Sequence, residues 1–227
     1  MVARLTLALF DVDGTLVDSQ SQIAASMRAA FGAVDLPAPA HAAVLSIIGL
    51  SLPLAMRALA PGASDGQIAK LTGAYREAFI KLRQDGAVPP LYPGAAELLA
   101  RLAARDTVFL GIATGKARRG LDHVLAAHGL DGVFHTAQVA DDHPSKPHPS
   151  MALQALAETG VEPRDCVMIG DTSFDMEMGR AAGVRAVGVG WGYHAAEALL
   201  RAGAETIVDD FAALGAALEQ IWMRETR

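Results

Sequence analysis

From Gly94 to the end of the chain, short apolar runs alternate with segments of helical periodicity. We expect strands at residues 107–112, within 133–139, and at 166–169, 185–189 and 206–208. We expect helices at residues 95–105, 118–128, 148–158, 173–182, 195–201 and 211–221. This alternation predicts an α/β fold with a parallel, doubly wound sheet and helices on both faces. Ligands bind such sheets beyond the carboxyl ends of the strands.

The chain before Gly94 has a different pattern. A short apolar strand is expected at residues 5–10, but no strand-like run follows it before Val88. The pattern instead predicts helices at residues 19–31, with Ser19 as the N-cap, and at 41–48, 52–60 and 65–82. We predict that residues 17–88 form an inserted all-helical cap domain, and that residues 1–16 and 89–227 form the catalytic core. A cap with two connections can close over a site at the strand ends.

Composition narrows the possible partners and compartment. Of 227 residues, 52% are hydrophobic, and the net charge of −6 argues against a nucleic-acid backbone as the partner. The single cysteine, Cys166, excludes an intramolecular disulfide, so we expect a cytoplasmic protein. The first apolar run is too short for a signal peptide, and no stretch approaches the roughly 20 apolar residues of a membrane span.

Two aspartates, Asp11 and Asp13, follow the first expected strand, with Gly14 and Thr15 directly behind them. Residues at positions i and i+2 of an extended segment point the same way, so the two carboxylates share one strand end. Two negative charges at such a short separation repel each other unless a cation or a shared proton lies between them. Oxygen ligands suit a hard cation, and we therefore expect Mg²⁺ at this site.

Other strand ends add the remaining groups of a phosphoryl-transfer site. Thr114 follows the strand at residues 107–112, Asp171 follows the strand at 166–169, and Asp175 comes four residues later. Lys146 lies in a proline-rich loop that precedes a helix. Carboxyl ends of parallel strands meet at one edge of a sheet, so we expect these side chains to converge.

Each group has a chemical role in this hypothesis. Asp11 is the candidate nucleophile, and Asp13 would act as general acid and later deprotonate the attacking water. Thr114 and the N–H groups of its turn, including Gly115, suit phosphate oxygens. Lys146 would supply a fixed positive charge to the nucleophile and the phosphoryl group.

The remaining two acids would support the metal and the lysine. Asp171 would complete the metal shell, and Asp175 would orient Lys146 or a metal-bound water. The flanking residues have simpler interpretations. Asp18 favours the start of the following helix. Lys116, Arg118 and Arg119 are expected on a solvated helix face, with an extension of the positive potential of the site as the alternative. We expect structural or surface positions for the histidines, including His143 and His148.

These motifs together resemble the haloacid dehalogenase superfamily over essentially the whole chain. The segment DVDGTLV at Asp11, Thr114 after an apolar strand, Lys146 in SKPHP, and GDTSFD through Asp175 follow in the order of its four motifs. The resemblance implies a Rossmann-like core, Mg²⁺ and an aspartyl-phosphate intermediate. It implies metal ligands from the Asp11 carboxylate, the backbone carbonyl of Asp13 and the Asp171 carboxylate. A helical cap between the first two motifs resembles subfamily I with a C1 cap.

Single residues separate the activities known in that subgroup. Its haloacid dehalogenases and phosphonatases lack the second aspartate of the first motif, whereas Asp13 is present at that position here. Its β-phosphoglucomutases carry a histidine where this chain has Ile23. Hydrolysis of a small phosphate monoester remains, with phosphoglycolate as the nearest named substrate and sugar phosphates, nucleotides and pyrophosphate as alternatives. A non-enzymatic phosphate- or partner-binding module would be expected to lose Asp11, Thr114 or Lys146.

In this architecture the cap would select the substrate. Gly49 and Ser51 lie at the break between two expected cap helices and are candidates for specificity. Ser51, or the N–H groups of the helix that begins at Leu52, could bind a substrate carboxylate, and Arg57 is a more distant candidate. We expect a small phosphorylated metabolite as partner, no nucleic acid or membrane, and a monomer or homodimer.

Overall fold

The computed structural model describes residues 4–84 and 88–224. Its centre is one six-stranded parallel sheet in the order β3-β2-β1-β4-β5-β6. The strands are β1 (Thr6–Phe10), β2 (Val108–Thr114), β3 (Thr136–Val139), β4 (Cys166–Gly170), β5 (Arg185–Val189) and β6 (Thr206–Val208). The prediction of a parallel α/β fold is confirmed.

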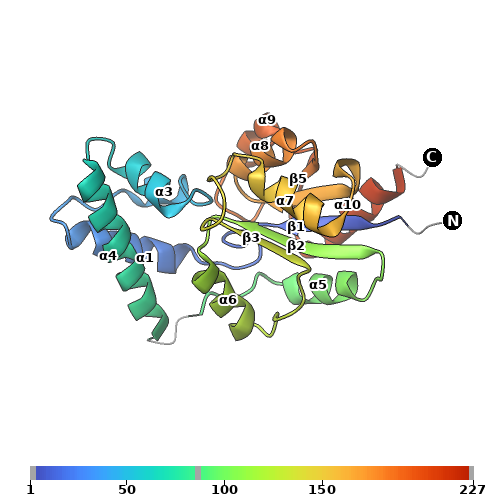
Figure 1. Ribbon diagram of the computed structural model, residues 1–227, viewed down its shortest axis with the longest axis horizontal. Coiled ribbons are helices and arrows are strands. Elements are labelled where there is room, and N and C mark those ends of the chain that lie inside the picture. Colours follow the sequence, from blue (N-terminus) through green and yellow to red (C-terminus); the bar gives the residue numbers. More distant parts are fainter. Residues whose placement is uncertain (1–3, 85–87, 225–227) are drawn as a thin grey trace.

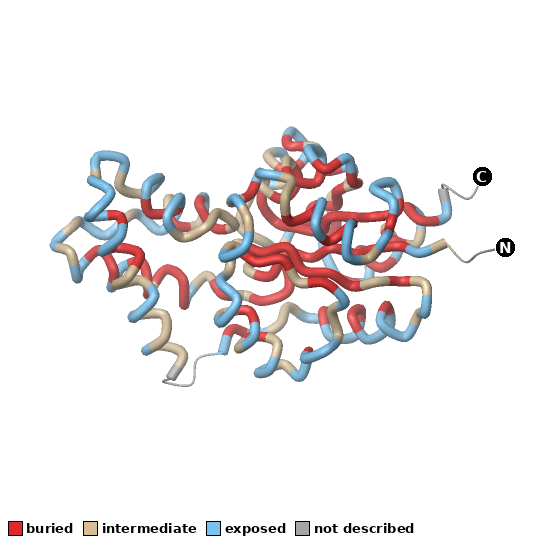
Figure 2. Tube along the Cα trace, viewed as in Figure 1, coloured by how far each residue is buried: buried red, intermediate tan, exposed pale blue. Residues whose placement is uncertain are grey.

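Alternating side chains of the strands form two apolar cores, one on each face of the sheet. Helices lie on both sides of the sheet, and the strands are mostly buried (Figures 1 and 2). Ala8 and Phe10 of β1 pack toward one face, whereas Leu7 and Leu9 pack toward the other. The first face is covered by α5 (Ala95–Ala103), α6 (Arg118–Ala127) and α10 (Phe211–Arg224). The second is covered by α7 (Ser150–Thr159), α8 (Ser173–Ala181) and α9 (Ala196–Ala202).

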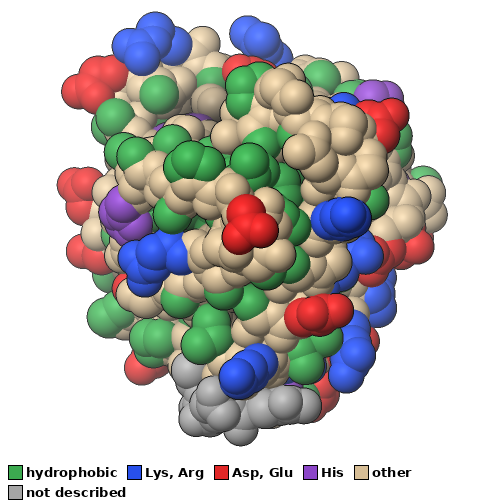
Figure 3. Space-filling model, turned by 90° about the vertical axis from the view of Figure 1, so that its left-hand side faces the viewer, with side chains coloured by type: hydrophobic (Ala, Val, Ile, Leu, Met, Phe, Trp, Pro, Cys, Tyr) green, Lys and Arg blue, Asp and Glu red, His purple; other side chains and the backbone are tan. Residues whose placement is uncertain are grey.

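Four helices between β1 and α5 lie beyond one end of the sheet (Figure 1). They are α1 (Gln20–Gly32), α2 (His41–Leu45), α3 (Leu52–Leu59) and α4 (Asp65–Gln84), and they enclose an apolar cluster of their own. The face of this end carries basic and acidic side chains interspersed among hydrophobic ones (Figure 3). The strands and these helices therefore have separate cores.

The two connections to the helical segment run side by side. Val17 forms an antiparallel bridge with Leu91, and Asp18 N donates to Pro90 O at 2.9 Å. Their pairing agrees with the expected entry and exit, but the division into a core and a cap domain stays a prediction. Residues 1–3 and 225–227 of the predicted core, and 85–87 of the predicted cap, lie outside the described residues.

Two local expectations were wrong in detail. The helix from His41 ends at Leu45 rather than at residue 48, because Ile47 N and Ile48 N donate to carbonyls three residues back and form turns. Ser19 precedes α1 without a side-chain capping bond; its hydroxyl instead lies 3.3 Å from the Tyr193 hydroxyl. A short 3₁₀ helix at Pro163–Asp165 has no counterpart among the predicted elements.

The strand order positions a site at the carboxyl end of β1. After β1 the chain adds β2 and β3 on one side of β1, and then crosses over to add β4, β5 and β6 on the other side. The direction in which strands are added to the sheet therefore reverses at β1. Such a reversal opens a crevice at the strand ends. Asp11 directly follows β1, Asp171 directly follows β4, and Thr114 ends β2 two residues beyond the expected terminus. Among the described residues, no helix combines the length and apolar character needed to cross a membrane.

Candidate active site at the carboxyl ends of the strands

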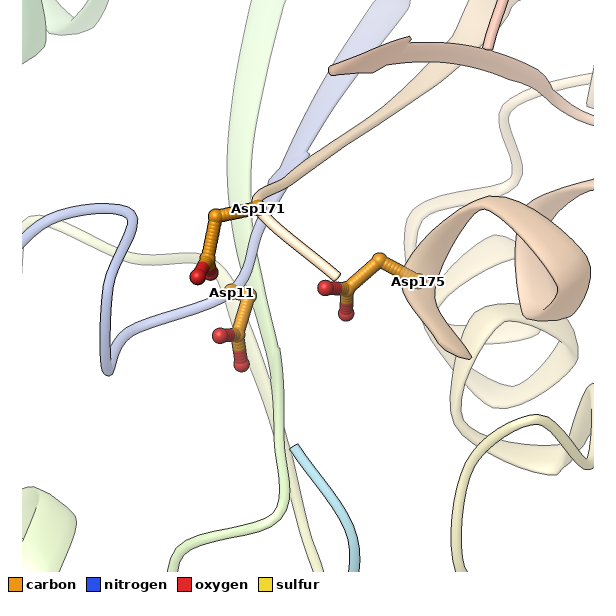
Figure 4. Close-up of side chains that lie close together, drawn as sticks. All are labelled: Asp11, Asp171 and Asp175. Atoms are coloured by element: carbon orange, nitrogen blue, oxygen red, sulfur yellow. The ribbon is translucent and has the colours of Figure 1, made fainter. Parts of the chain in front are cut away.

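Three buried carboxylates meet where β1 and β4 end (Figure 4). Asp11, Asp171 and Asp175 each offer an oxygen atom, and these atoms lie within 4.8 Å of one another. All three side chains are almost completely shielded from solvent. The predicted convergence of Asp11 with Asp171 and Asp175 is therefore present in the fold.

Lys146 lies between two of these acids. Its Nζ atom donates to Asp11 Oδ1 at 2.7 Å and to Asp175 Oδ1 at 2.6 Å, and the residue is buried. The other oxygen of Asp175 accepts bonds from the backbone N–H and hydroxyl of Thr172 in a capping box at the start of α8. Both oxygens of Asp175 are thus engaged, and its position orients Lys146 toward Asp11.

Charge and burial shift the pKa values of this cluster. Burial raises the pKa of Asp11 to about 7, with Lys146 opposing and the charges of Asp175 and Asp13 adding to the rise. Burial alone lowers the pKa of Lys146, but Asp11 and Asp175 outweigh it and raise that pKa above its ordinary value. Burial and the neighbouring carboxylates also raise the pKa of Asp171. The single positive charge of Lys146 therefore does not compensate the negative charges of this carboxylate cluster.

The donor set fits a divalent cation. Asp11 Oδ2 and Asp13 Oδ1 are buried and have no hydrogen-bond partner among the described residues. Buried, unpartnered carboxylate oxygens are costly unless a cation binds them. Asp171 is held in place by Thr15 Oγ1 and Tyr193 N, each of which donates to it at 2.9 Å. An all-oxygen set of this kind suits a hard cation.

Asp13 contacts a residue that sequence reasoning assigned to a solvated surface. Lys116 Nζ lies 2.8 Å from Asp13 Oδ2, and the two side chains are only 8% and 13% exposed. The same Nζ lies 5.3 Å from the centroid of the Phe79 ring on α4. The expectation for Lys116 was therefore wrong. Its position two residues after Thr114 was the signal that could have indicated a site residue.

Thr114 and Gly115 form the turn after β2. Thr114 is buried, and its Oγ1 accepts a bond from Lys116 N at 3.2 Å, so its own proton is free to point elsewhere. A Cβ atom at Gly115 would lie 2.6 Å from Gly49 O and 2.9 Å from Leu50 O. The backbone between α2 and α3 is thus packed directly on this turn.

A substitution at Gly115 tests that close packing. Gly115→Ala should lower kcat/KM by up to about 10²-fold, because the added methyl group forces the Gly49 backbone away from the site. Steady-state kinetics on any turned-over ester would measure the change. Gly66→Ala is the control, since nothing lies within 4 Å of a Cβ atom there. Equal kinetics for both variants and the wild type would contradict the packing argument.

A cavity of about 620 Å³ opens between this site and the helical segment. Asp11, Asp13, Thr114 and Gly115 line it from the sheet side, and Gly49 and Ser51 line it from the other. Ser51 N is already engaged, since it donates to Ser145 Oγ at 2.7 Å. Arg57 is absent from the lining and pairs with Asp65 at 2.7 Å on the exposed surface.

The histidines beside Lys146 have structural partners. His143 Nδ1 lies 2.8 Å from Ser150 Oγ, and His143 Nε2 lies 2.8 Å from Gln138 Oε1. His148 Nδ1 accepts a bond from Ser150 N at the start of α7. These contacts agree with the expectation that neither residue takes part in the chemistry.

Comparison with known proteins identifies the family. The model of the haloacid dehalogenase-like hydrolases matches residues 8–189, which is most of the chain. The chain belongs to this family. A probable phosphatase IndB from Dickeya dadantii is 35% identical over 208 residues, which cover 90% of each chain. A phosphoglycolate phosphatase from Haemophilus influenzae is 31% identical over 223 residues, which cover 94% of this chain and 98% of the relative.

A solved structure supports the same assignment. A hydrolase from Pseudomonas syringae is 30% identical and has a TM-score of 0.85, with 95% of this chain and 99% of that one covered. The predicted resemblance to haloacid dehalogenase-like hydrolases is confirmed, and the protein is an enzyme of a hydrolase family. In this member Asp11, Thr114, Lys146 and the GDTSFD segment lie around one site.

Three residues that support the site of this family member were not predicted. Thr15 and Tyr193 position the Asp171 carboxylate through the hydrogen bonds given above. Gly14 has a φ of 91°, and a Cβ atom there would overlap the Asp171 carboxylate and the Tyr193 ring. The Gly14–Thr15 pair was visible in the sequence. Nothing in the sequence indicated a role for Tyr193, because its contact with Asp171 depends on the path of the loop after β5.

Proposed function

We propose that this protein is a cytosolic, Mg²⁺-dependent phosphatase that hydrolyses a small phosphate monoester through an aspartyl-phosphate at Asp11. The observation that carries the proposal is the state of the Asp11 carboxylate. One oxygen is fixed by Lys146 at 2.7 Å, while the other is unpartnered among the described residues, and the residue lines the cavity. The phosphatase names of the relatives from Dickeya and Haemophilus support the same reaction class.

The proposed reaction has two steps. An Asp11 oxygen attacks phosphorus while the P–O bond to the leaving alcohol breaks, and Asp13 donates the proton that the alcohol requires. Asp13 then takes a proton from water as the water oxygen attacks phosphorus, which releases phosphate and restores Asp11. Thr114, the Gly115 N–H and Lys146 would bind the phosphoryl oxygens during both steps.

The cation would be held by the Asp11 and Asp171 carboxylates and the backbone carbonyl of Asp13. Asp175 is proposed to position Lys146 and not to bind the cation, because one of its oxygens accepts a bond from the Lys146 ammonium and the other accepts two bonds from Thr172. Each Asp171 oxygen, in contrast, accepts one bond from a neutral donor and keeps a lone pair for the cation. When bound, Mg²⁺ would neutralise charge on the phosphoryl oxygens and the surrounding carboxylates. Residues 17–88 would act as a cap that excludes bulk water and macromolecular substrates, in a monomer or homodimer.

The experiment that tests the proposal is phosphate release from a panel of small esters with Mg²⁺ and with EDTA. The panel includes phosphoglycolate, because the Haemophilus relative carries that name. It also includes a sugar phosphate, a nucleoside monophosphate, an aryl phosphate and pyrophosphate. We expect Mg²⁺-dependent release from at least one member. Release that is equal with EDTA would contradict the proposed metal dependence, and release from none would contradict the proposed activity.

Metal binding should also appear as a pH-dependent gain in stability. In the metal-free protein the pKa of folded Asp11 is about 7, above its unfolded value of 3.8. The folded state therefore holds an extra proton between these values, and its stability falls as the pH rises through that window. Because Mg²⁺ competes with this proton, it should raise the Tm more at pH 8 than at pH 5.

The asparagine variant is the control for that measurement. Asp11→Asn removes both the titrating group and a proposed ligand, so its Mg²⁺-induced increase in Tm should be small at both pH values. Differential scanning calorimetry with and without Mg²⁺ measures the increase in Tm for each of the two proteins at each of the two pH values. An equal Mg²⁺ effect in the wild type and the variant would show that the cation stabilises the fold elsewhere.

A further inference from the structure

The cavity wall on α4 has a mixed character. Tyr75, Phe79 and Arg83 recur every four residues and therefore share one face of the helix, and Arg76 and Ile80 lie beside them. All five line the cavity of about 620 Å³. Cavities of roughly 300–1,000 Å³ hold ligands much larger than a two-carbon acid phosphate. The volume therefore leaves room for a bulkier leaving group.

Aromatic rings reach the reacting groups. Phe79 faces Lys116 Nζ at 5.3 Å, and this Nζ lies 2.8 Å from the Asp13 carboxylate. Tyr75 stacks on Phe79 with ring centroids 5.8 Å apart, and burial and the nearby Asp13 charge raise its pKa. A leaving group that departs past Asp13 and Lys116 would therefore lie near an apolar, flat surface.

Another part of the cavity wall is also apolar. Ile23, Met27, Ile47 and Ile48 line the same cavity and are buried. Lys116 Nζ lies 5.3 Å from the centroid of the Phe79 ring, but Asp13 already compensates its charge. A carboxylate placed beside Lys116 would therefore lose water without gaining an unpaired cation.

Other cations line the same cavity. Arg76, Arg83 and Arg119 line it and have no hydrogen-bond or ion-pair partner within residues 4–84 and 88–224. Arg83 follows Phe79 by one helical turn, about 6 Å along the axis. Arg83 and Lys116 both lower the pKa of His123 on α6, after the larger effect of burial, so positive charge gathers between α4 and α6. This region suits a second anionic group.

We infer that the leaving group of the substrate is a flat, largely apolar ring that carries a second anionic group on its far side. This inference rests on the proposed phosphatase activity and names its substrate class: aryl or heteroaryl phosphate monoesters with a distal carboxylate or phosphate. The P–O bond to the ring-bearing oxygen breaks, and the oxygen leaves as the protonated alcohol. The ring packs on Tyr75 and Phe79, and the distal anion pairs with Arg83 and Arg119. Phosphoglycolate has no ring to pack on Tyr75 and Phe79.

Three esters separate these features. Phenyl phosphate offers the ring, 4-carboxyphenyl phosphate offers the ring and the distal anion, and phosphoglycolate offers an anion without a ring. With Mg²⁺, kcat/KM should be about tenfold or more higher for 4-carboxyphenyl phosphate than for phenyl phosphate, and lowest for phosphoglycolate. We define the ratio of the first two values as the carboxylate preference.

Variants assign the preference to residues. Arg83→Gln and Arg119→Gln should each lower the carboxylate preference about fivefold or more. Arg28→Gln is the matched control, because Arg28 is exposed on α1 and absent from the cavity lining, and the preference should not change. Phe79→Leu should lower kcat/KM for both aryl esters relative to phosphoglycolate, since the aromatic surface is lost.

The outcomes separate this inference from the proposed function. Mg²⁺-dependent hydrolysis in which phosphoglycolate is the best of the three esters would overturn the inference and leave the phosphatase activity intact. A carboxylate preference that survives both arginine substitutions would also overturn it. Phosphate release from none of the three esters, with Mg²⁺-dependent release from another member of the wider panel, would overturn the inference alone. Absence of release from every compound tested would overturn the proposed function, and the inference with it.

Discussion

Asp11→Asn should lower kcat by about 10⁴-fold or more on every ester that the wild type hydrolyses. An amide nitrogen or oxygen cannot form the proposed acyl phosphate, whereas the asparagine side chain has nearly the same size and shape as the carboxylate. The amide oxygen can still accept the bond that Lys146 donates at 2.7 Å, so the fold should be retained. Steady-state phosphate release and circular dichroism measure both effects.

The matched control for this substitution is Asp131→Asn, at an exposed aspartate outside the site. It should keep wild-type kinetics. If Asp11→Asn retained substantial activity while its fold was unchanged, a role for Asp11 as nucleophile would be untenable, and direct attack by water would be the simpler mechanism.

Lys146→Met should destabilise the protein by about 3–5 kcal/mol, as expected when one partner of a buried ion pair is removed. Lys146 is fully buried between Asp11 and Asp175, at 2.7 Å and 2.6 Å, and without it two carboxylates would face each other unpaired. Chemical denaturation of the metal-free protein measures the change. Turnover should fall as well, because the proposed charge on the phosphoryl group is lost.

A double substitution distinguishes ion-pair loss from poor packing of methionine. Adding Asp175→Asn to Lys146→Met should recover part of the lost stability, because one of the two unpaired charges is removed. Lys70→Met, at an exposed lysine of α4, is the control and should change stability little. If Asp175→Asn lowered the stability of the Lys146→Met variant as much as it lowers that of the wild type, the ion-pair explanation would be wrong.

The sequence allowed good prediction wherever local pattern and chemistry coincide. Buried parallel strands such as β4 (Cys166–Gly170) are short apolar runs that end in Asp or Gly, so their carboxyl ends can be located in the chain. That is why Asp11, Thr114 and Asp171 could be placed at one edge of the sheet. Lys146 has no strand end to locate it, because its loop reaches the site through tertiary packing, and its assignment depended on the groups and motifs around it.

The parts that failed depend on contacts between distant segments. Lys116 has the sequence context of a helix start, and its burial depends on Asp13 and on Phe79, which comes from another part of the chain. Ser19 has a capping sequence, but the Tyr193 hydroxyl competes for its side chain. The sequence of α4, which forms one wall of the cavity, has the pattern of an ordinary amphipathic helix. Helical periodicity alone does not tell whether an aromatic stripe packs in a core or lines a cavity.

The measurement that tests the central claim most directly is chemical trapping of the covalent intermediate. The enzyme is quenched in acid during Mg²⁺-dependent turnover, reduced with borohydride, digested and examined by mass spectrometry. Hydride reduces an acyl phosphate to the alcohol, so the account predicts that Asp11 is converted to homoserine, and only when substrate is present. Conversion of a different acid, with Asp11 unmodified, would contradict the account.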